Sequence, residues 1–257
     1  MNRIASAALT IFFLAASAEA IADEVVTETR SVDARVLKVM VGGVIDLRVK
    51  QGAVATLTIT GDKRYVSQVS TSAHGDTLDI DADNEGHSLH FTRDDKHQLR
   101  AELTLPNLSE FTSRGVGSTD LAGFGGKEVK LALDGAGVVT FNGRYRVVNA
   151  RLGGVGSMTL NTGDTDLIDL RMHGAGQITV SGTSKLLQAK LGGVGGLDAE
   201  KLLADKVDLN LTGLGGATVY AKDTANLNLT GLGSATVYGQ PPHRTSNSRG
   251  LGSVAFK

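Results

Sequence analysis

Hydrophobic residues in this chain alternate with other residues in short runs, such as LAL at 131–133 and ITV at 178–180. A period of two is typical of strands that bury one face. Residues 209–220 read LNLTGLGGATVY and residues 227–238 read LNLTGLGSATVY, so one run returns with a single change. The pattern predicts a chain built from many copies of one short β unit.

A glycine–x–glycine triplet marks each copy of the unit. The triplets begin at Gly115, Gly135, Gly154, Gly174, Gly193, Gly213, Gly231 and Gly250. Their spacing of 18 to 20 residues is typical of stacked solenoid coils. Because glycine adopts positive φ without a steric penalty, we expect each triplet to form a corner.

Alignment on the triplets arranges apolar residues in columns. Two positions before the triplet stand Leu133, Leu152, Met172, Leu191, Leu211 and Leu229. Two and four positions after it stand Val139 and Phe141, Met158 and Leu160, Ile178 and Val180, Leu197 and Ala199, Ala217 and Val219, Ala235 and Val237, and Val254 and Phe256. In the middle of the triplet stand Val116, Ala136, Val155, Ala175, Val194, Leu214, Leu232 and Leu251. We predict that all of these columns point into the core.

The columns predict an all-β fold, a parallel β-helix of single coils with about 19 residues each. We expect it to be right-handed, from the general bias of parallel crossovers. The regular helix should span residues 111–257. Residues 23–110 lack the triplets but keep strand alternation, at 44–49, 55–60, 77–83 and 99–106. We expect this part to be irregular β-structure that covers the N-terminal end of the stack and continues into it.

Residues 1–22 have the pattern of a secretory signal peptide, with Arg3 before an apolar run and small residues near Ala20 and Ala22. No later stretch is apolar enough to cross a bilayer. The chain has no cysteine, so we expect no lipid anchor and no disulfides. The sequence thus predicts an exported protein in the periplasm, on the cell surface or outside the cell.

The charges are nearly balanced, with 26 basic and 27 acidic residues, which disfavours a nucleic-acid partner. Outward columns are the candidates for binding. One of them stands three positions before the triplets and reads Ala132, Arg151, Arg171, Lys190, Asn210 and Asn228. Arg151, Arg171 and Lys190, near His173, would dock an acidic glycan or a lipopolysaccharide phosphate. The alternative is a solvated face neutralised by Asp169 and Asp208.

Two further outward columns have a candidate role. Tyr220 and Tyr238 occupy equivalent positions and would form a sugar-stacking platform, or else a simple aromatic pair between coils. The other column reads Asp120, Thr140, Thr159, Thr179, Asp198, Thr218, Thr236 and Ala255. A threonine ladder suggests ice binding, but β-branched threonine also suits any exposed strand.

Few residues of the chain are candidates for catalysis. Asp134 and His173 share a column two coils apart, but no second acid accompanies them. The segment 74–90 holds three histidines and alternating aspartates, yet it fails the EF-hand pattern, and strand alternation explains the aspartates as one solvent face. An adventitious metal site at His87 and His90 is the alternative. We expect no catalytic residues, no metal and no cofactor.

Three segments together carry a resemblance to a known family. They are VGGVIDLRVKQGAVATLTITGD at 41–62, GDTLDIDAD at 75–83, and LRAELTLPNLSEFTSRGVGSTDL at 99–121 ahead of the triplets. In this order they resemble the head GIN domain family, described as auto-transporter adhesin heads. The resemblance covers nearly all of the exported chain. It implies a right-handed β-helix without an established activity. Because no barrel-forming segment follows Lys257, we expect that display on the surface would need a separate partner.

Together these features predict a secreted, non-enzymatic β-helix of the bacterial cell envelope that binds a glycan or a protein through its extended faces. The expected partners are an envelope polysaccharide or a surface protein. The alternatives are a polysaccharide-cleaving enzyme and a purely structural envelope protein. The sequence leaves the oligomeric state open.

Overall fold

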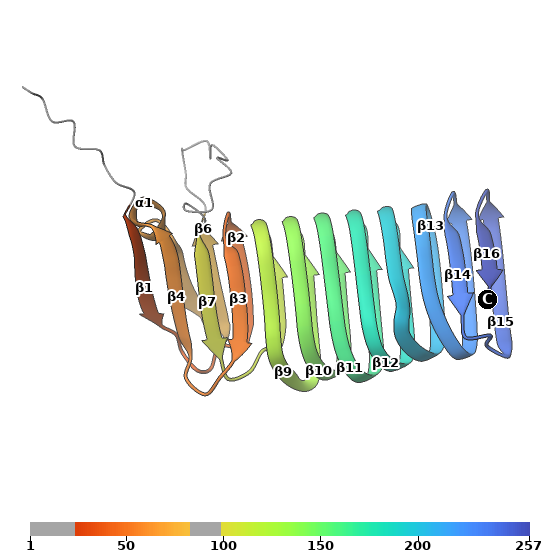
Figure 1. Cartoon of the computed structure of the whole chain (residues 1–257), viewed down its shortest axis with the longest axis horizontal. Helices are drawn as coiled ribbons and strands as arrows, with labels where there is room; N and C mark the ends of the chain where they lie inside the picture. The colour runs from red at the N-terminus through yellow and green to blue at the C-terminus, as the bar shows by residue number, and fades with distance from the viewer. Residues whose placement is uncertain (1–23, 83–98) are drawn as a thin grey trace, which may run out of the picture.

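A computed structural model describes residues 24–82 and 99–257 of the chain. These residues form a parallel β-solenoid of about seven turns, with about 20 residues per turn, preceded by irregular strands (Figure 1). Strands make up 79% of the structure and helix 2%. The predicted fold class is therefore confirmed. The predicted signal peptide, at residues 1–22, lies outside the described residues.

The regular part of the solenoid consists of long strands that each run around most of a coil. They are β9 (Val116–Leu133), β10 (Ala136–Leu152), β11 (Val155–Met172), β12 (Ala175–Leu191) and β13 (Val194–Gly231), which runs through two coils. The C-terminal strands β14 (Ser234–Tyr238), β15 (His243–Gly250) and β16 (Ser253–Phe256) complete the stack. Neighbouring coils pair in parallel with the triplets in register, so that like residues stand beside like residues.

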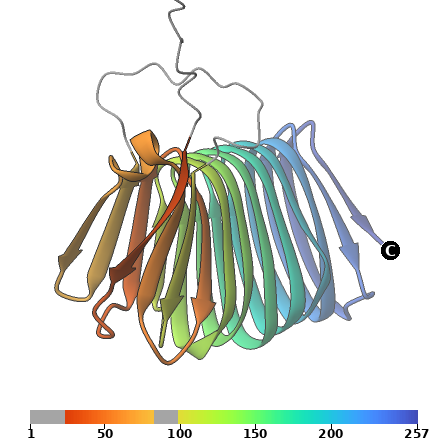
Figure 2. The same cartoon turned by 60° about the vertical axis from the view of Figure 1, so that its left-hand side comes forward.

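Each coil has two long faces, which Figure 2 shows nearly end-on. We call the strand after each triplet face A (118–122 and its equivalents) and the strand before it face B (128–133 and its equivalents). The triplets form the glycine corner between them. At the opposite corner the register shifts, for example between Asn142 and Val147. The coils therefore absorb their different lengths there, and the glycine corner stays aligned.

The apolar columns before and after the triplets fill the core. Leu133, Leu152, Met172, Leu191, Leu211 and Leu229 are all buried, as are the paired columns on face A up to Val237. Burial of these columns is the main stabilising term, because a single coil has no interior of its own. The prediction for both sets is confirmed.

The prediction for the middle of the triplets is wrong, because these residues are exposed. Val116 is 44% exposed, Val155 61% and Leu251 88%, and the alanines of the column are exposed as well. Alternation continues unbroken through the corner. Since Ala136 lies three residues from both Leu133 and Val139, and those two point inward, it must point outward.

Close stacking explains the glycines of the triplets. A Cβ atom on Gly154 would overlap the carbonyl oxygen of Gly135 in the preceding coil, and one on Gly156 would overlap that of Gly137. Positive φ accounts for at most one glycine of each pair, such as Gly156 with φ 144°, and for neither Gly135 nor Gly137. The sequence argument from positive φ was therefore incomplete, because the main requirement is the contact between backbones.

The N-terminal part contains two further coils in a rearranged order. One consists of β2 (Lys38–Gly43) and β3 (Asp46–Gln51), and the other of β6 (Thr77–Ala82) and β7 (Arg100–Leu105). The β2–β3 coil lies between the β6–β7 coil and the first triplet coil, which begins with β8 (Glu110–Ser113). The chain therefore returns past an earlier coil before the regular stack starts.

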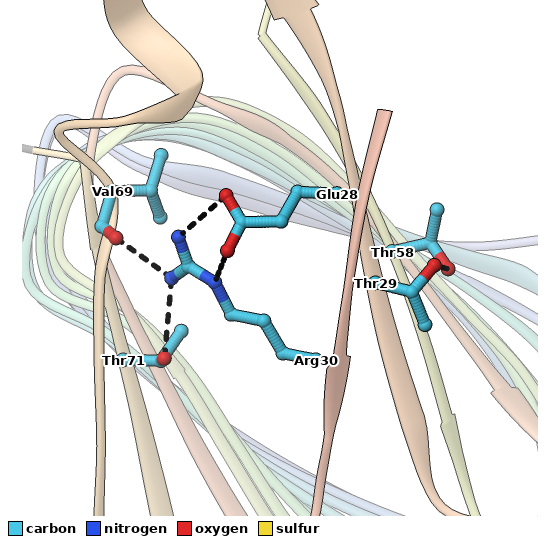
Figure 3. Close-up of polar contacts among 6 residues, drawn as sticks. All are labelled: Glu28, Thr29, Arg30, Thr58, Val69 and Thr71. Atoms are coloured by element: carbon cyan, nitrogen blue, oxygen red, sulfur yellow. Dashed lines mark hydrogen bonds and ion pairs between the residues drawn. The ribbon is translucent and has the colours of Figure 1, made fainter. Parts of the chain in front are cut away.

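Antiparallel strands close the N-terminal end, where the sequence predicted irregular β-structure. They are β1 (Val25–Ser31), β4 (Thr56–Asp62) and β5 (Ser70–His74), with the short helix α1 (Lys63–Val66) between β4 and β5. Figure 3 shows Arg30 reaching from β1 to the other side of this cap. Its guanidinium donates to the Val69 carbonyl at 2.7 Å and to Thr71 Oγ1 at 3.2 Å, and it pairs with Glu28 at 2.9 Å. Arg30 thus ties the two faces together at the end of the core.

The C-terminal end is closed by polar residues. Every residue of β15 is exposed, and this strand pairs with β13 along one edge. Arg244 stands in register with the buried Ala225, lies 5.1 Å over the Phe256 ring and donates to the Pro241 carbonyl at 2.7 Å. Polar and charged terminal strands discourage edge-to-edge pairing.

Candidate functional site

A groove lies on face B, at the first coils of the regular stack. Its walls come from β8, β9, β10 and β11. The lining residues are Glu110, Phe111, Thr112, Glu128, Lys130, Leu131, Ala132, Asn149, Ala150, Arg151, Asp169 and Arg171. The lining combines carboxylates, cations and an amide with the apolar residues Phe111, Leu131 and Ala150. A concave surface that combines apolar residues with a few polar groups is suited to a ligand.

The predicted basic stripe stands in register on this face. Arg151 pairs with Arg171, and Arg171 pairs with Lys190, on three successive coils. The structure brings Arg151 and Arg171 to the groove, whereas Lys190 lies one coil beyond its lining.

Two of the three cations of the stripe are partly neutralised. Arg171 binds Asp169 at 2.8 Å, as the sequence suggested. Arg151 binds Asp134 at 2.6 Å, a partner that sequence reasoning had considered only as a catalytic acid. In residues 24–82 and 99–257, Lys190 forms no ion pair, and Asp208 accepts instead from Asn226 at 2.9 Å.

Electrostatics at the groove follow from these contacts. The hydrogen bonds that Arg171 donates to Asp169, together with the negative charge of that carboxylate, raise the pKa of Arg171 above its usual value. The Arg171 guanidinium therefore stays charged at any physiological pH. Arg171 uses Nε and one terminal nitrogen on Asp169, whereas Arg151 uses one terminal nitrogen on Asp134. Each guanidinium has five N–H groups, so donors are left for a ligand.

Amide side chains extend the polar surface of face B. Asn149 donates to Glu128 at 3.0 Å inside the groove, and Asn228 donates to Asn210 at 3.2 Å farther along the stripe. Such side chains offer donors and acceptors at the spacing of the coils, about 4.8 Å. The triplet alignment puts Thr112 of β8 beside Ala132, and Ala132 beside Arg151, but it does not show that this part of the face is hollowed.

The candidate acid–base pair has no free acid. Asp134 is bound to Arg151, and its carboxylate lies where a Cβ on Gly153 would stand. Gly153 thus leaves room for Asp134 to fold over the next coil, whereas a Cβ on Gly192 would meet His173 only at 3.8 Å, an ordinary contact. The ion pair with Arg151 favours a structural role for Asp134.

Face A carries mainly hydroxyl and amide groups. Thr140, Thr159 and Thr179 stand in register. Beside them Asn161 donates to Asn142 at 2.7 Å. Asp120 precedes these threonines in the column, and Asp198 separates them from Thr218 and Thr236.

Tyr220 and Tyr238 also stand in register on face A. The ring of Tyr220 lies against Gly239, and that of Tyr238 lies 5.8 Å from Lys257 Nζ. Among the described residues the aromatic ring pair is Phe141 with Tyr145, so the two tyrosines do not stack on each other. Their outer surfaces remain a candidate contact for a sugar ring.

The exposed middle residues of the triplets form an apolar ridge along the glycine corner. We define this apolar ridge as Val116, Ala136, Val155, Ala175, Val194, Leu214, Leu232 and Leu251. Sequence reasoning found the column but placed it in the core. Counting alternation through the triplet would have found its outward direction.

Two classes of site find no support in the described part of the chain. No group of three or more potential metal-binding side chains occurs there, and Asp79 and Asp81 alternate with buried Leu78 and Ile80 as expected. The proposed metal site at His87 and His90 lies outside the described residues. Within residues 24–82 and 99–257, no helix has the length and apolarity that a bilayer span requires.

The fold and its repeated outward columns define a β-solenoid with an extended polar surface. A family profile described as "putative auto-transporter adhesin, head GIN domain" matches residues 37–241, and the chain belongs to this family. The resemblance seen in the sequence is thereby confirmed.

Solved structures share the same fold. A structure from Parabacteroides merdae described as a putative adhesin has a TM-score of 0.81 at 18% identity, covering 91% of this chain and 96% of that one. A putative adhesin from Bacteroides fragilis has a TM-score of 0.68 at 20% identity, with 92% and 98% covered. A putative lipid binding protein from Parabacteroides distasonis has a TM-score of 0.75 at 19% identity, with 90% and 96% covered. No curated protein matches the chain.

Proposed function

We propose that this protein is an exported, non-enzymatic binding protein of the bacterial envelope, and that face B holds an acidic glycan. The observation that carries the proposal is the in-register stripe of Arg151, Arg171 and Lys190 beside the groove. Membership in an adhesin family supports a binding role. The signal-peptide pattern of residues 1–22 supports export.

An acidic glycan matches the chemistry of this surface. Charge-assisted bonds from guanidinium groups to carboxylate or sulfate oxygens are the strong polar contacts available here. Amides and paired carboxylates next to them bind sugar hydroxyl groups, which donate and accept at once. A ligand with repeated units also matches a surface whose cations recur on successive coils.

The same contacts argue for binding without cleavage. Glycoside hydrolysis needs two carboxyl groups that flank one bond, with one of them free to give a proton. Asp134 is engaged by Arg151, and the other carboxylate of the stripe, Asp169, is engaged by Arg171. We therefore propose that the protein binds a polysaccharide without cleaving it.

The test is retention of the purified protein on immobilised polygalacturonate and heparin, with dextran as the neutral comparison. We expect retention on the acidic polymers, elution by salt, and no release of reducing or unsaturated ends. Arg151→Ala combined with Arg171→Ala should weaken retention about tenfold or more, because two charge-assisted contacts are lost.

A charge-matched control is available at the opposite corner. Arg146 and Lys185 both bind Asp166, at 2.6 and 2.7 Å, so Arg146→Ala with Lys185→Ala also removes two paired cations. This control should leave retention unchanged. Equal loss in both double variants would reduce the interaction to net charge, polymer cleavage would establish an enzyme, and no retention at all would favour a purely structural protein.

A further inference from the structure

The apolar ridge is the most regular outward feature of the molecule. All eight positions are apolar, whereas every other outward column of the regular coils mixes polar, charged or glycine residues. The six valines and leucines of the ridge are 44–88% exposed. With coils about 4.8 Å apart, the ridge is about 34 Å long. An exposed apolar surface of this extent marks an interaction site.

The two flanks of the ridge differ in size and charge. The column before the first glycine carries bulky or charged side chains, including Arg114, Asp134, His173 and Arg249. The column after the second glycine is uncharged and mostly very small. We call it the small strip, and its smallest members are Ser118, Ser157, Gly196, Gly216, Ser234 and Ser253. A glycine backbone separates ridge and strip, so a low step runs beside the ridge on that side.

We propose that the apolar ridge is a dimer interface, in which two copies of this chain lie parallel and each ridge packs on the small strip of the other. A parallel two-fold axis along the solenoid places ridge opposite strip on both sides at once, as a symmetric interface requires. The ridge recurs at the coil spacing, and a second copy presents the strip at the same spacing over the same length. This proposal does not depend on glycan binding at face B, because face B stays exposed in the proposed dimer.

Charge and shape favour this arrangement over an antiparallel one. A two-fold axis across the solenoid would set ridge against ridge, so that two convex edges meet. It would also bring Arg114 of one copy near Arg249 of the other, which are like charges at the two ends. In the parallel pair the charged flanks point away from the interface.

A lipid surface is the other apolar partner that a ridge suits, but its flanks argue against one. Membrane-bound apolar faces are bordered by several cations that contact anionic headgroups. From Gly192 to Ser234 the residues beside the ridge on both sides are glycine, serine and threonine. Uncharged, small neighbours instead permit close contact between two proteins.

Sedimentation velocity on the purified protein at micromolar concentration tests the interface. We expect a dimer, and we expect Leu214→Asp combined with Leu232→Asp to halve the measured mass. Leu203→Asp is the matched control, because Leu203 is 51% exposed, like Leu214, but stands at the opposite corner. It should remain dimeric, and circular dichroism should show unchanged strand content in all variants. A monomeric wild type, or a dimer that survives the ridge variant, would overturn the proposal.

Single-cysteine cross-linking tests the parallel orientation, because the chain has no cysteine of its own. Val116→Cys and Leu251→Cys place one thiol at either end of the ridge. In a parallel dimer each variant cross-links to itself through a short bismaleimide. In an antiparallel dimer only a mixture of the two variants would cross-link, and that result would refute the parallel orientation.

Flotation with vesicles of phosphatidylcholine and phosphatidylglycerol tests the membrane alternative. We expect the protein to stay unbound. Binding to the vesicles that is lost in the ridge variant would replace the dimer interface by a membrane contact.

Discussion

Face A and face B share one core but differ in their outward chemistry. Between residues 118 and 238, the outward positions of face A hold mostly hydroxyl, amide and small side chains together with three carboxylates, and no cation. Face B holds Arg151, Arg171 and Lys190 in register, with carboxylates and amides around them. The inward columns are apolar on both faces. The stack thus fixes what points inward and leaves the outward columns free to specialise.

The outward side chains have an electrostatic cost on face B only. Asn161 donates to Asn142 on face A, so adjacent coils bind each other through neutral side chains. Like charges in register repel on face B, and Arg151 and Arg171 are stabilised by separate carboxylates. A neutral column would stack without this repulsion, so the cations of face B carry a cost that the proposed glycan site would account for.

The largest expected effect comes from breaking the corner that both faces share. A Cβ in Gly193→Ala would overlap the Gly174 carbonyl of the preceding coil, so the coils would have to separate. We expect a loss of about 3 kcal/mol or more in unfolding free energy, measured by urea denaturation. Both glycan retention and dimer formation should fall with it.

Gly192→Ala is the matched control for Gly193→Ala. Its added Cβ would lie 3.6 Å from the nearest atoms, which is ordinary contact, although it is the adjacent residue in the same corner. We expect a change within about 0.5 kcal/mol. Equal destabilisation by both substitutions would show that the backbone flexibility of glycine, and not the close contact between coils, explains the glycines of this corner.

Sequence periodicity was sufficient to predict the stacked coils. Leu133 and Leu152 recur at the coil length, and such a column is buried only if each coil lies flat on the next. The register of Arg151 with Arg171 follows from the same alignment. Local pattern therefore determined the regular part of the fold and the neighbours on face B.

The sequence pattern did not predict the order in which the N-terminal coils stack. Val44 bridges Val116, so the residues GGV at 42–44 form a corner of the stack, although the coil they belong to comes earlier in the chain than β6 and β7. No local signal tells which coil stacks on which. The groove on face B does not depend on that order, because Glu110 and Phe111 stack on β9 in the triplet register. The ridge was misplaced because apolar character outweighed alternation.

A smaller effect is expected from a substitution that loosens the groove on face B and leaves the dimer interface unchanged. The hydroxyl of buried Tyr145 donates to the Leu108 carbonyl, which holds the segment leading into β8 and the groove. Tyr145→Phe removes this bond and leaves the carbonyl without its partner, at a cost of about 1–2 kcal/mol in urea denaturation. Retention on acidic polymers should weaken, whereas the dimer should persist. A variant that loses the dimer but keeps retention would contradict this division.

The same tyrosine predicts a pH dependence. Burial raises the pKa of Tyr145 to about 12, from an ordinary value of 10.0. A raised pKa means that the folded state holds this proton more firmly, so the contribution is complete below pH 10 and is lost as the pH rises toward 12. Thermal melts of wild type and Tyr145→Phe should therefore converge over this range. Parallel melting curves would show that the hydroxyl does not titrate with folding.

A change on face B alone should sharpen its role. Asp134→Asn frees the Arg151 guanidinium from its ion pair at 2.6 Å and leaves the side chain nearly the same size. If the ligand is acidic, we expect retention on polygalacturonate to increase severalfold, because less charge is neutralised at the groove. Asp198→Asn on face A removes the same charge and should change retention little. A decrease for Asp134→Asn would indicate that the ion pair orients Arg151 for the ligand.

The smallest expected effect lies at the corner opposite the glycines, where face A passes into face B. There one carboxylate, Asp166, lies between Lys185 and Arg146, and their hydrogen bonds lower its pKa below the usual 3.8. A lowered pKa stabilises the fold above pH 3.8, and the contribution disappears as the pH falls through the lower folded-state value. Asp166→Asn should therefore lower the melting temperature slightly at neutral pH and low salt, and not at acidic pH or high salt, because exposed pairs are screened. Asp205→Asn, on a carboxylate without a salt bridge in the described structure, is the control and should leave both melts unchanged. Equal melts for all three proteins at neutral pH would mean that Asp166 adds no measurable stability by bridging Lys185 and Arg146.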